Sequence, residues 1–350
     1  MKVKDIKKGY LTFEEIQKEF KKQPPVNYLY SGVKEKSFGI IFGPSKSGKT
    51  VFCENLALNL AIGAKSYFGY KLSGKSVRIL FIGLEEYWVS RVERNNKQFQ
   101  ALTDVEKKLY NVNYLFQPID YLSLIIKKSH WIKLEETIKE SNAKVVFIDS
   151  ITRMNHGNLE DSKTAQEIMQ KLRDICYRQQ ITLICIHHTP KMHNKPINMD
   201  SIKGSAVFAQ ESDFAIGINK VINGRRYVKN VFFRYASEDD VKIKEFEILP
   251  STRLNYLEEV YEDKIISASD RRRNDKNRED IVKFFNSKNC NIYSTKELLL
   301  VFLVTLELKE RQIKTYLKEL VEENKIATPK RGYYTSINCS DKKDGNDEEE

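Results

Sequence analysis

A glycine-rich stretch at residues 43–50, Gly-Pro-Ser-Lys-Ser-Gly-Lys-Thr, carries the clearest chemical signal in the sequence. It matches the spacing G-x-x-x-x-G-K-[ST], follows a short apolar run and opens a helical pattern, which is the context that this motif requires. The glycines let backbone N–H groups approach phosphate oxygens closely, and the start of the following helix adds a positive dipole. Lys49 supplies a charge to the β- and γ-phosphates, and Thr50 supplies a hydroxyl to Mg²⁺. The sequence therefore predicts an ATP·Mg²⁺ site, in which the expected nucleotide contacts are Gly43, Pro44, Ser45, Lys46, Ser47, Gly48, Lys49, Thr50 and Val51.

Acidic residues end two further apolar runs. Asp149 ends the run KVVFID, a position at which a carboxylate holds Mg²⁺, often through water. Glu85 and Glu86 end the run RILFIGLEE, at the carboxyl edge of a predicted strand, where open α/β sheets bind ligands. One acid of this pair can polarise an attacking water, and the other can favour the dipole of a following helix. We assign the first role to Glu85 and the second to Glu86.

A histidine pair, His187-His188, ends the run ITLICIHH. A polar side chain at this edge can touch the γ-phosphate and report its loss to the next loop. Adjacent residues of a strand point to opposite faces of the sheet, so the two rings are poorly placed to bind one metal ion. No C-x-x-C pair accompanies them, which also disfavours a metal site.

Buried strands alternating with helices must position these residues. Apolar runs without internal polar residues are typical of strands covered on both faces, and they occur at 38–42, 77–84, 112–116, 144–149 and 181–188. Helical patterns lie between them at 49–63, 87–100, 130–141 and 162–179. This alternation predicts an α/β domain with a mostly parallel sheet. After residue 204 the runs FAIGI, RRYVKNVFFRY and KIKEFEIL predict antiparallel strands that extend the sheet.

The chain divides into segments of different composition. We predict an N-terminal arm (1–30) with one helix capped by Thr12, an ATPase domain (31–262), a basic linker (263–277), a second domain (278–337) and an acidic disordered tail (338–350). The linker is predicted from its polar, basic composition without apolar periodicity. In the second domain, three helical patterns precede two strands around a Pro-Lys-Arg-Gly turn, which resembles a small α+β winged helix-turn-helix domain.

Composition narrows the class of protein. The 59 Lys and Arg residues exceed the 48 Asp and Glu residues by 11, which suits a polyanionic partner such as nucleic acid, or reflects a general preference for lysine. No run approaches the roughly 20 apolar residues of a membrane span, and the start of the chain lacks the apolar core of a signal peptide. The five cysteines form no C-x-x-C pair. We therefore expect a cytoplasmic protein without a membrane partner or a structural zinc site.

The phosphate-binding loop, the acid pair, VVFIDS, the strand ending in His-His and a Lys-Gly-Ser-Ala stretch occur in an order that resembles the RecA-like ATPases of the RepA type. These are hexameric replicative helicases of plasmids, related to DnaB and KaiC. The resemblance covers residues 31–257. It implies a RecA-like core, Glu85 as the catalytic glutamate, and His187 and His188 as the γ-phosphate sensor. Arg91 matches an arginine of the helix after the acid pair, with no role that we can derive.

The same resemblance implies nucleic-acid contacts and a site completed by a neighbouring subunit. Lys203 lies in the stretch that corresponds to a loop facing DNA in the central channel, with Lys191 and Lys195 nearby. An arginine finger from the neighbour is expected on the strand YVKNVFFRYAS, and we favour Arg234. The Lys-x-Arg spacing of the family is absent, and Arg225 and Arg226 are competing candidates. In the winged unit, the predicted nucleic-acid contacts are Lys314, Lys330 and Arg331.

These observations predict a homo-oligomeric, hexameric ATPase that couples hydrolysis of ATP to binding of DNA, as a helicase or a replication or recombination accessory of a mobile element. The alternative is an ATP-switched regulator, loading or partition factor that binds DNA through the winged unit without translocating. A small-molecule kinase is disfavoured, because no arginine-rich lid accompanies the phosphate-binding loop.

Overall fold

The computed structural model describes residues 9–23, 25, 27–154, 162–192, 194–202, 205–236, 242–288 and 291–342. The chain forms two compact units, residues 1–262 and 263–350. Among the described residues, no helix combines the length and apolar character needed to cross a membrane.

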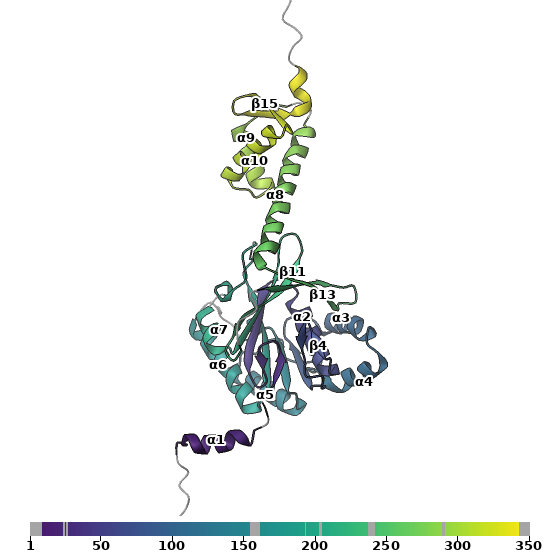
Figure 1. Cartoon of the computed structure of the whole chain (residues 1–350), viewed down its shortest axis with the longest axis vertical. Coiled ribbons are helices and arrows are strands. Elements are labelled where there is room, and N and C mark those ends of the chain that lie inside the picture. Colours follow the sequence, from purple (N-terminus) through teal and green to yellow (C-terminus); the bar gives the residue numbers. More distant parts are fainter. Residues whose placement is uncertain are drawn as a thin grey trace, which may run out of the picture. The chain divides into compact units, whose positions relative to one another are not determined.

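A central sheet organises the first unit (Figure 1). In the described part of the chain it has nine strands, in the spatial order β13 (Leu254–Val260), β12 (Ile243–Ile248), β11 (Arg226–Phe233), β10 (Phe214–Lys220), β3 (Phe38–Pro44), β9 (Thr182–Thr189), β8 (Val145–Asp149), β6 (Ile79–Gly83) and β7 (Tyr114–Phe116). The pairs from β10 to β7 are parallel, and those from β10 to β13 are antiparallel. The predicted α/β class with a mostly parallel sheet is therefore confirmed.

Helices cover both faces of this sheet, as Figure 1 shows. They are α2 (Lys49–Ile62), α3 (Trp88–Gln100) and α4 (Asp104–Asn113) on one side, and α5 (Lys128–Ser141), α6 (Ser162–Gln179) and α7 (Ser205–Glu211) on the other. Helix α2 is apolar around most of its circumference, and most of its side chains are buried. Its Phe52 and Leu56 pack with Phe81 and Phe147 of the sheet in the main core.

Shorter elements complete the unit: α1 (Phe13–Lys21), β1 (Tyr28–Tyr30), β2 (Val33–Lys34), β4 (Ser66–Tyr67), β5 (Tyr70–Lys71) and the 3₁₀ turns η1 (Ile151–Arg153) and η2 (Met199–Ser201). Helix α1 starts at the predicted cap, since Thr12 and Glu15 form a capping box. The predicted end of the arm at residue 30 is too late, because Leu29 and Tyr30 of β1 belong to the main core. Helix α4 was not predicted, although Thr103 and Glu106 form a capping box that the sequence displays.

The second unit has its own apolar core. Its elements are most of α8 (Glu262–Asn286), then β14 (Tyr293–Ser294), α9 (Thr295–Thr305), α10 (Glu310–Glu322), β15 (Ile326–Lys330), β16 (Tyr333–Ser336) and η3 (Ile337–Lys342). The three strands form an antiparallel sheet in the order β14-β16-β15. The core contains Phe285, Phe302 and Leu317 from the three helices.

Two predictions about this region are wrong. The segment 263–277 is no irregular linker, because α8 runs through it without a break. It contains no glycine or proline, and its arginines at 271–273 with Lys264, Lys276 and Ala268 favour a helix even without an apolar stripe. The predicted tail also begins too early, because η3 extends to Lys342. The remaining tail residues, 343–350, lie outside the described part of the chain.

Candidate nucleotide-binding site

The loop between β3 and α2 has the backbone that close approach to phosphates requires. A Cβ at Gly43 would lie 1.9 Å from the carbonyl oxygen of Ile218, so only glycine fits there. Gly48, just before α2, has a φ of +105°, which side chains disfavour. The Ser47 Oγ is buried and has no hydrogen-bond partner among the described residues, as expected of a group that awaits a ligand. The other predicted contacts lie in the same loop or in the first turn of α2: Pro44, Ser45, Lys46 and Val51.

Lys49 is held inside this loop. Its side chain is buried, and Nζ donates to the carbonyl oxygens of Gly43 at 2.9 Å and Pro44 at 2.8 Å. Burial lowers the pKa of Lys49 to about 8, although Asp149 and Glu85 act in the opposite direction. A buried ammonium group with this lowered pKa gains strongly from a negatively charged ligand.

Thr50 and Asp149 present oxygen ligands side by side. The Thr50 hydroxyl donates to Asp149 Oδ2 at 2.6 Å. Burial raises the pKa of Asp149, and the hydrogen bond from Thr50 partly offsets this effect. Hydroxyl and carboxylate oxygens are ligands that Mg²⁺ prefers, and a divalent cation would offset the cost of burying the Asp149 charge. These two residues therefore fit the predicted Mg²⁺ position.

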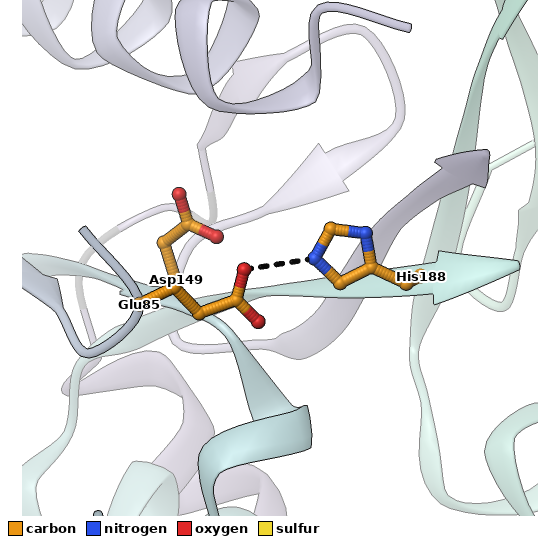
Figure 2. A group of neighbouring side chains, drawn as sticks. All are labelled: Glu85, Asp149 and His188. Atoms are coloured by element: carbon orange, nitrogen blue, oxygen red, sulfur yellow. Dashed lines mark hydrogen bonds and ion pairs between the residues drawn. The ribbon is translucent and has the colours of Figure 1, made fainter. Parts of the chain in front are cut away.

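Glu85 lies beside Asp149, beyond the end of β6 (Figure 2). Its Oε1 accepts hydrogen bonds from the hydroxyls of Ser150 and Thr152, and its Oε2 bonds to His188 Nε2 at 3.0 Å. Burial alone would raise the pKa of Glu85, but the three hydrogen bonds lower it to about 2. The carboxylate is thus fully ionised near neutral pH, and it is held in place by three donors.

The two histidines lie on opposite faces of β9, as the alternation of a strand requires. His188 faces the nucleotide loop, and Glu85, Asp149 and His188 each offer a ligand atom within 4.8 Å of the others (Figure 2). The imidazole of His188 is already bonded to Glu85, so the oxygen ligands remain the better match for Mg²⁺. His187 instead stacks on Phe208 of α7, with ring centroids 4.4 Å apart. Burial lowers the pKa of His187 to about 3, which keeps the ring neutral.

A second charged network, formed by Arg94, Glu54 and Glu86, lies next to Glu85, and the sequence did not predict it. Arg94 of α3 makes two hydrogen bonds of 2.7 Å to the buried carboxylate of Glu54 and two more, of 2.7 and 2.6 Å, to Glu86. Arg91, one turn earlier, is buried against Gly83 and lies 4.9 Å over the ring of Phe81. Arg94 therefore joins α3 to α2 through Glu54, and Glu86 binds Arg94 in addition to lying just before a helix start.

The arginine-finger candidates are already engaged within the chain. Arg234 lies at the opposite end of the sheet, where it donates to the carbonyl oxygens of Gln210 and Ser212 at 2.8 and 3.2 Å and pairs with Asp213 at 3.4 Å. Arg225 is paired with Glu245. The Cδ of Arg226 lies 3.7 Å from the Cβ position of Gly48, beside the phosphate-binding loop of its own chain.

The predicted nucleic-acid contacts lie in both units of the chain. Lys191 and Lys195 are exposed in the segment after β9, and Lys203 lies outside the described residues. In the second unit, Lys314 of α10 pairs with Glu310 at 2.6 Å. Lys330 and Arg331 are exposed at the turn between β15 and β16.

The structure thus brings together Lys49, Thr50, Asp149, Glu85 and His188, and it leaves His187 and Arg234 outside the site.

A model of a family described as "AAA domain" matches residues 9–194, slightly more than half of the chain. This segment contains the phosphate-binding loop and four of the strands whose ends form the site. The family consists of P-loop ATPases related to the RecA- and RepA-like helicases. The chain belongs to this AAA domain family and carries a nucleotide-hydrolysing P-loop ATPase domain.

Proposed function

We propose that this protein hydrolyses ATP with Mg²⁺ and couples hydrolysis to binding of nucleic acid, as an oligomeric ATPase of the RepA type. The observation that carries the catalytic part is the meeting of Glu85 and His188 with Lys49, Thr50 and Asp149 at one edge of the sheet. Parallel strands place their carboxyl ends at a common edge, and this edge is where open α/β sheets bind ligands.

Each residue has a role that its contacts support. Lys49 exchanges its two carbonyl partners for phosphate oxygens, and Thr50 and Asp149 hold Mg²⁺. When bound, Mg²⁺ neutralises charge on the phosphates. Glu85 orients and polarises the attacking water. A carboxylate with a pKa of about 2 is a weak base, so Glu85 gains basicity when one of its three donors leaves.

His188 is the donor best suited to leave. It lies on β9 next to the loop, pairing with Gly43 in the register of β3 and β9, and its strand leads directly into the segment that carries Lys191 and Lys195. Movement of His188 from Glu85 toward the γ-phosphate would activate Glu85 and displace that segment. This link supports a coupling between hydrolysis and nucleic acid held by the segment.

The net charge of +11 supports a polyanionic partner. A homo-oligomer, with six subunits in the RepA type, would let a neighbour supply the arginine of the site. Arg234 can fill that role only if it leaves the partners that it has within the chain.

Steady-state ATP hydrolysis at low salt tests this proposal, measured without nucleic acid, with single-stranded DNA and with duplex DNA. Lys49→Ala is the blank, because it removes the positive charge that contacts the phosphates. Stimulation of several-fold by single-stranded DNA, absent in the blank, supports a nucleic-acid-coupled ATPase. Hydrolysis that is equal in all three conditions would overturn the coupling.

The second unit favours one alternative. Part of α8 with α9 and α10, followed by the hairpin β15–β16, has the order of elements of a winged helix-turn-helix, and the hairpin turn exposes Lys330 and Arg331. An ATP-switched regulator that binds duplex DNA through this unit would hydrolyse ATP slowly and ignore single strands. In that case, removal of both hairpin cations by Lys330→Ala and Arg331→Ala would weaken duplex binding and leave ATP hydrolysis unchanged.

A further inference from the structure

Two adjoining hollows lie at the edge of the sheet opposite the nucleotide site. One has a volume of about 470 Å³ and the other about 340 Å³, and both are lined by Glu35, Lys36 and Gln180. They are located where β3, β6, β8 and β9 begin, whereas the nucleotide site is formed where these strands end. The span of β9 from Thr182 to His188 puts the two edges about 20 Å apart, at about 3.3 Å per residue.

Five basic side chains line these hollows. The larger is lined by Lys36, Lys75, Arg78 and Lys144, and the smaller adds Lys34. None of the five forms an ion pair with a carboxylate of the described part of the chain, and the Arg78 Nε donates to a carbonyl oxygen of Ser141. They come from three separate segments of the chain, 34–36, 75–78 and 144, so only the fold brings them together.

Few carboxylates oppose these charges. Glu35, which lines both hollows, accepts a hydrogen bond from Asn27 at 3.3 Å. Asp213 lines the smaller hollow, but its carboxylate forms ion pairs with Arg173 at 2.8 Å and with Arg234 at 3.4 Å. The surface therefore keeps an excess of exposed positive charge, which suits a chain of phosphates better than a single small anion.

Two exposed tyrosines line the smaller hollow. Tyr177 at the end of α6 is 49% exposed, and Tyr235 after β11 is 44% exposed. Lys34 Nζ lies 4.5 Å from the ring centroid of Tyr235, and the guanidinium of Arg173 lies 5.7 Å from that of Tyr177. Aromatic rings beside a basic groove are platforms on which unpaired bases stack. Bases within a duplex are not available to such rings, so this combination favours a single strand.

We propose that this groove, defined by Lys34, Lys36, Lys75, Arg78, Lys144, Tyr177 and Tyr235 and called the amino-edge groove, binds a single-stranded polynucleotide. Phosphates contact the lysines and Arg78, and bases stack on Tyr177 and Tyr235. The inference rests on the proposed function for the kind of partner, but it places that partner on a surface remote from Lys191 and Lys195.

Fluorescence anisotropy of the full chain without nucleotide tests the proposal, with a 20-residue oligothymidylate and a 20-residue oligouridylate as probes. The groove variant combines Lys75→Ala, Arg78→Ala and Lys144→Ala. The control variant combines Lys97→Ala, Lys108→Ala and Lys128→Ala, which removes the same charge from exposed positions on α3, α4 and α5. Matching unfolding temperatures establish that both variants fold.

We expect the groove variant to bind at least tenfold more weakly and the control variant to stay within threefold of the unmodified chain. The slope of log affinity against log salt should fall by about two in the groove variant, because each neutralised phosphate of a single strand adds about 0.7 to that slope. Tyr177→Ala should weaken binding at least fivefold, whereas Tyr177→Phe, which keeps the ring, should not. The two probes distinguish a DNA strand from an RNA strand.

Equal binding by the groove and control variants would overturn the proposal, and so would tighter binding of a 20-base-pair duplex than of either probe. The proposed function fails separately, because it requires hydrolysis to be stimulated by nucleic acid. Loss of binding in the groove variant with no stimulation in the unmodified chain would uphold the groove and reject the coupling. Normal stimulation of the unmodified chain, with unchanged binding in the groove variant, would uphold the coupling and reject the groove.

Discussion

The buried amino group of Lys49 should link nucleotide binding to pH. Burial lowers its pKa from 10.5 to about 8 in the unliganded protein. Only the ammonium form attracts phosphate, so a bound triphosphate should return the pKa of Lys49 toward its ordinary value. Above pH 8, binding must therefore take up a proton, and the affinity must fall as the pH rises.

The size of the effect follows from the fraction of charged Lys49. With a pKa of about 8, about nine-tenths of the unliganded chains carry the charge at pH 7 and about one-tenth at pH 9. The dissociation constant of a non-hydrolysable ATP analogue with Mg²⁺ should thus rise about tenfold between these values, which is about 1.4 kcal/mol. Stability responds in the opposite sense to affinity. The free energy of unfolding without nucleotide should increase as the pH rises from 8 to 10.5, because the unfolded chain binds the extra proton there.

Isothermal titration calorimetry in two buffers with different ionisation enthalpies measures both the affinity and the protons taken up. We expect uptake to approach one proton per site at pH 9. Lys49→Arg is the matched control, since its guanidinium stays charged over this range and its affinity should not change with pH. A constant affinity of the unmodified chain from pH 7 to 9, without proton uptake, would refute the reasoning.

Two further predictions concern the supporting contacts. Arg94→Ala leaves the buried Glu54 carboxylate unpaired and should lower the free energy of unfolding by about 3–5 kcal/mol in urea, whereas Lys97→Ala on the same helix, which breaks only an exposed pair, should change it by less than about 0.5 kcal/mol. Equal stability of the two variants would contradict the structural role of Arg94. His188→Ala removes a hydrogen bond to a charged group worth about 1.5–3 kcal/mol, and should raise the pKa of Glu85 from about 2 by about one to two units. Titration of the glutamate carboxyl carbons by NMR, with Glu85→Gln to assign the signal, checks this shift, and an unmoved Glu85 signal would show that His188 does not set its pKa.

The juxtaposition of Lys49, Asp149, Glu85 and His188 was predictable from the sequence. Each residue lies at or just beyond the end of an apolar run, and parallel strands bring such ends to one edge of a sheet. The separation of His187 from His188 was equally readable, because neighbouring residues of a strand alternate between faces.

Contacts between segments remote from one another in the sequence were not predictable in this way. The Arg94–Glu54 pair depends on how α3 packs on α2, and no spacing in the sequence encodes that packing. Arg234 was placed by analogy at a neighbour's phosphate, whereas its position at the opposite edge of the sheet follows from the pairing of β11 with β10. The amino-edge groove was invisible for the same reason, since its cations and tyrosines come from separate segments.

Single-turnover hydrolysis by Glu85→Gln tests the central claim most directly, measured together with the affinity for Mg²⁺·ATP. The substitution keeps the size of the side chain and removes the charge that polarises water. Our account predicts hydrolysis at least 100-fold slower than in the unmodified chain, with an affinity within about threefold. Hydrolysis at the unmodified rate, or loss of binding in parallel with hydrolysis, would contradict the assignment of Glu85 as the residue that activates water.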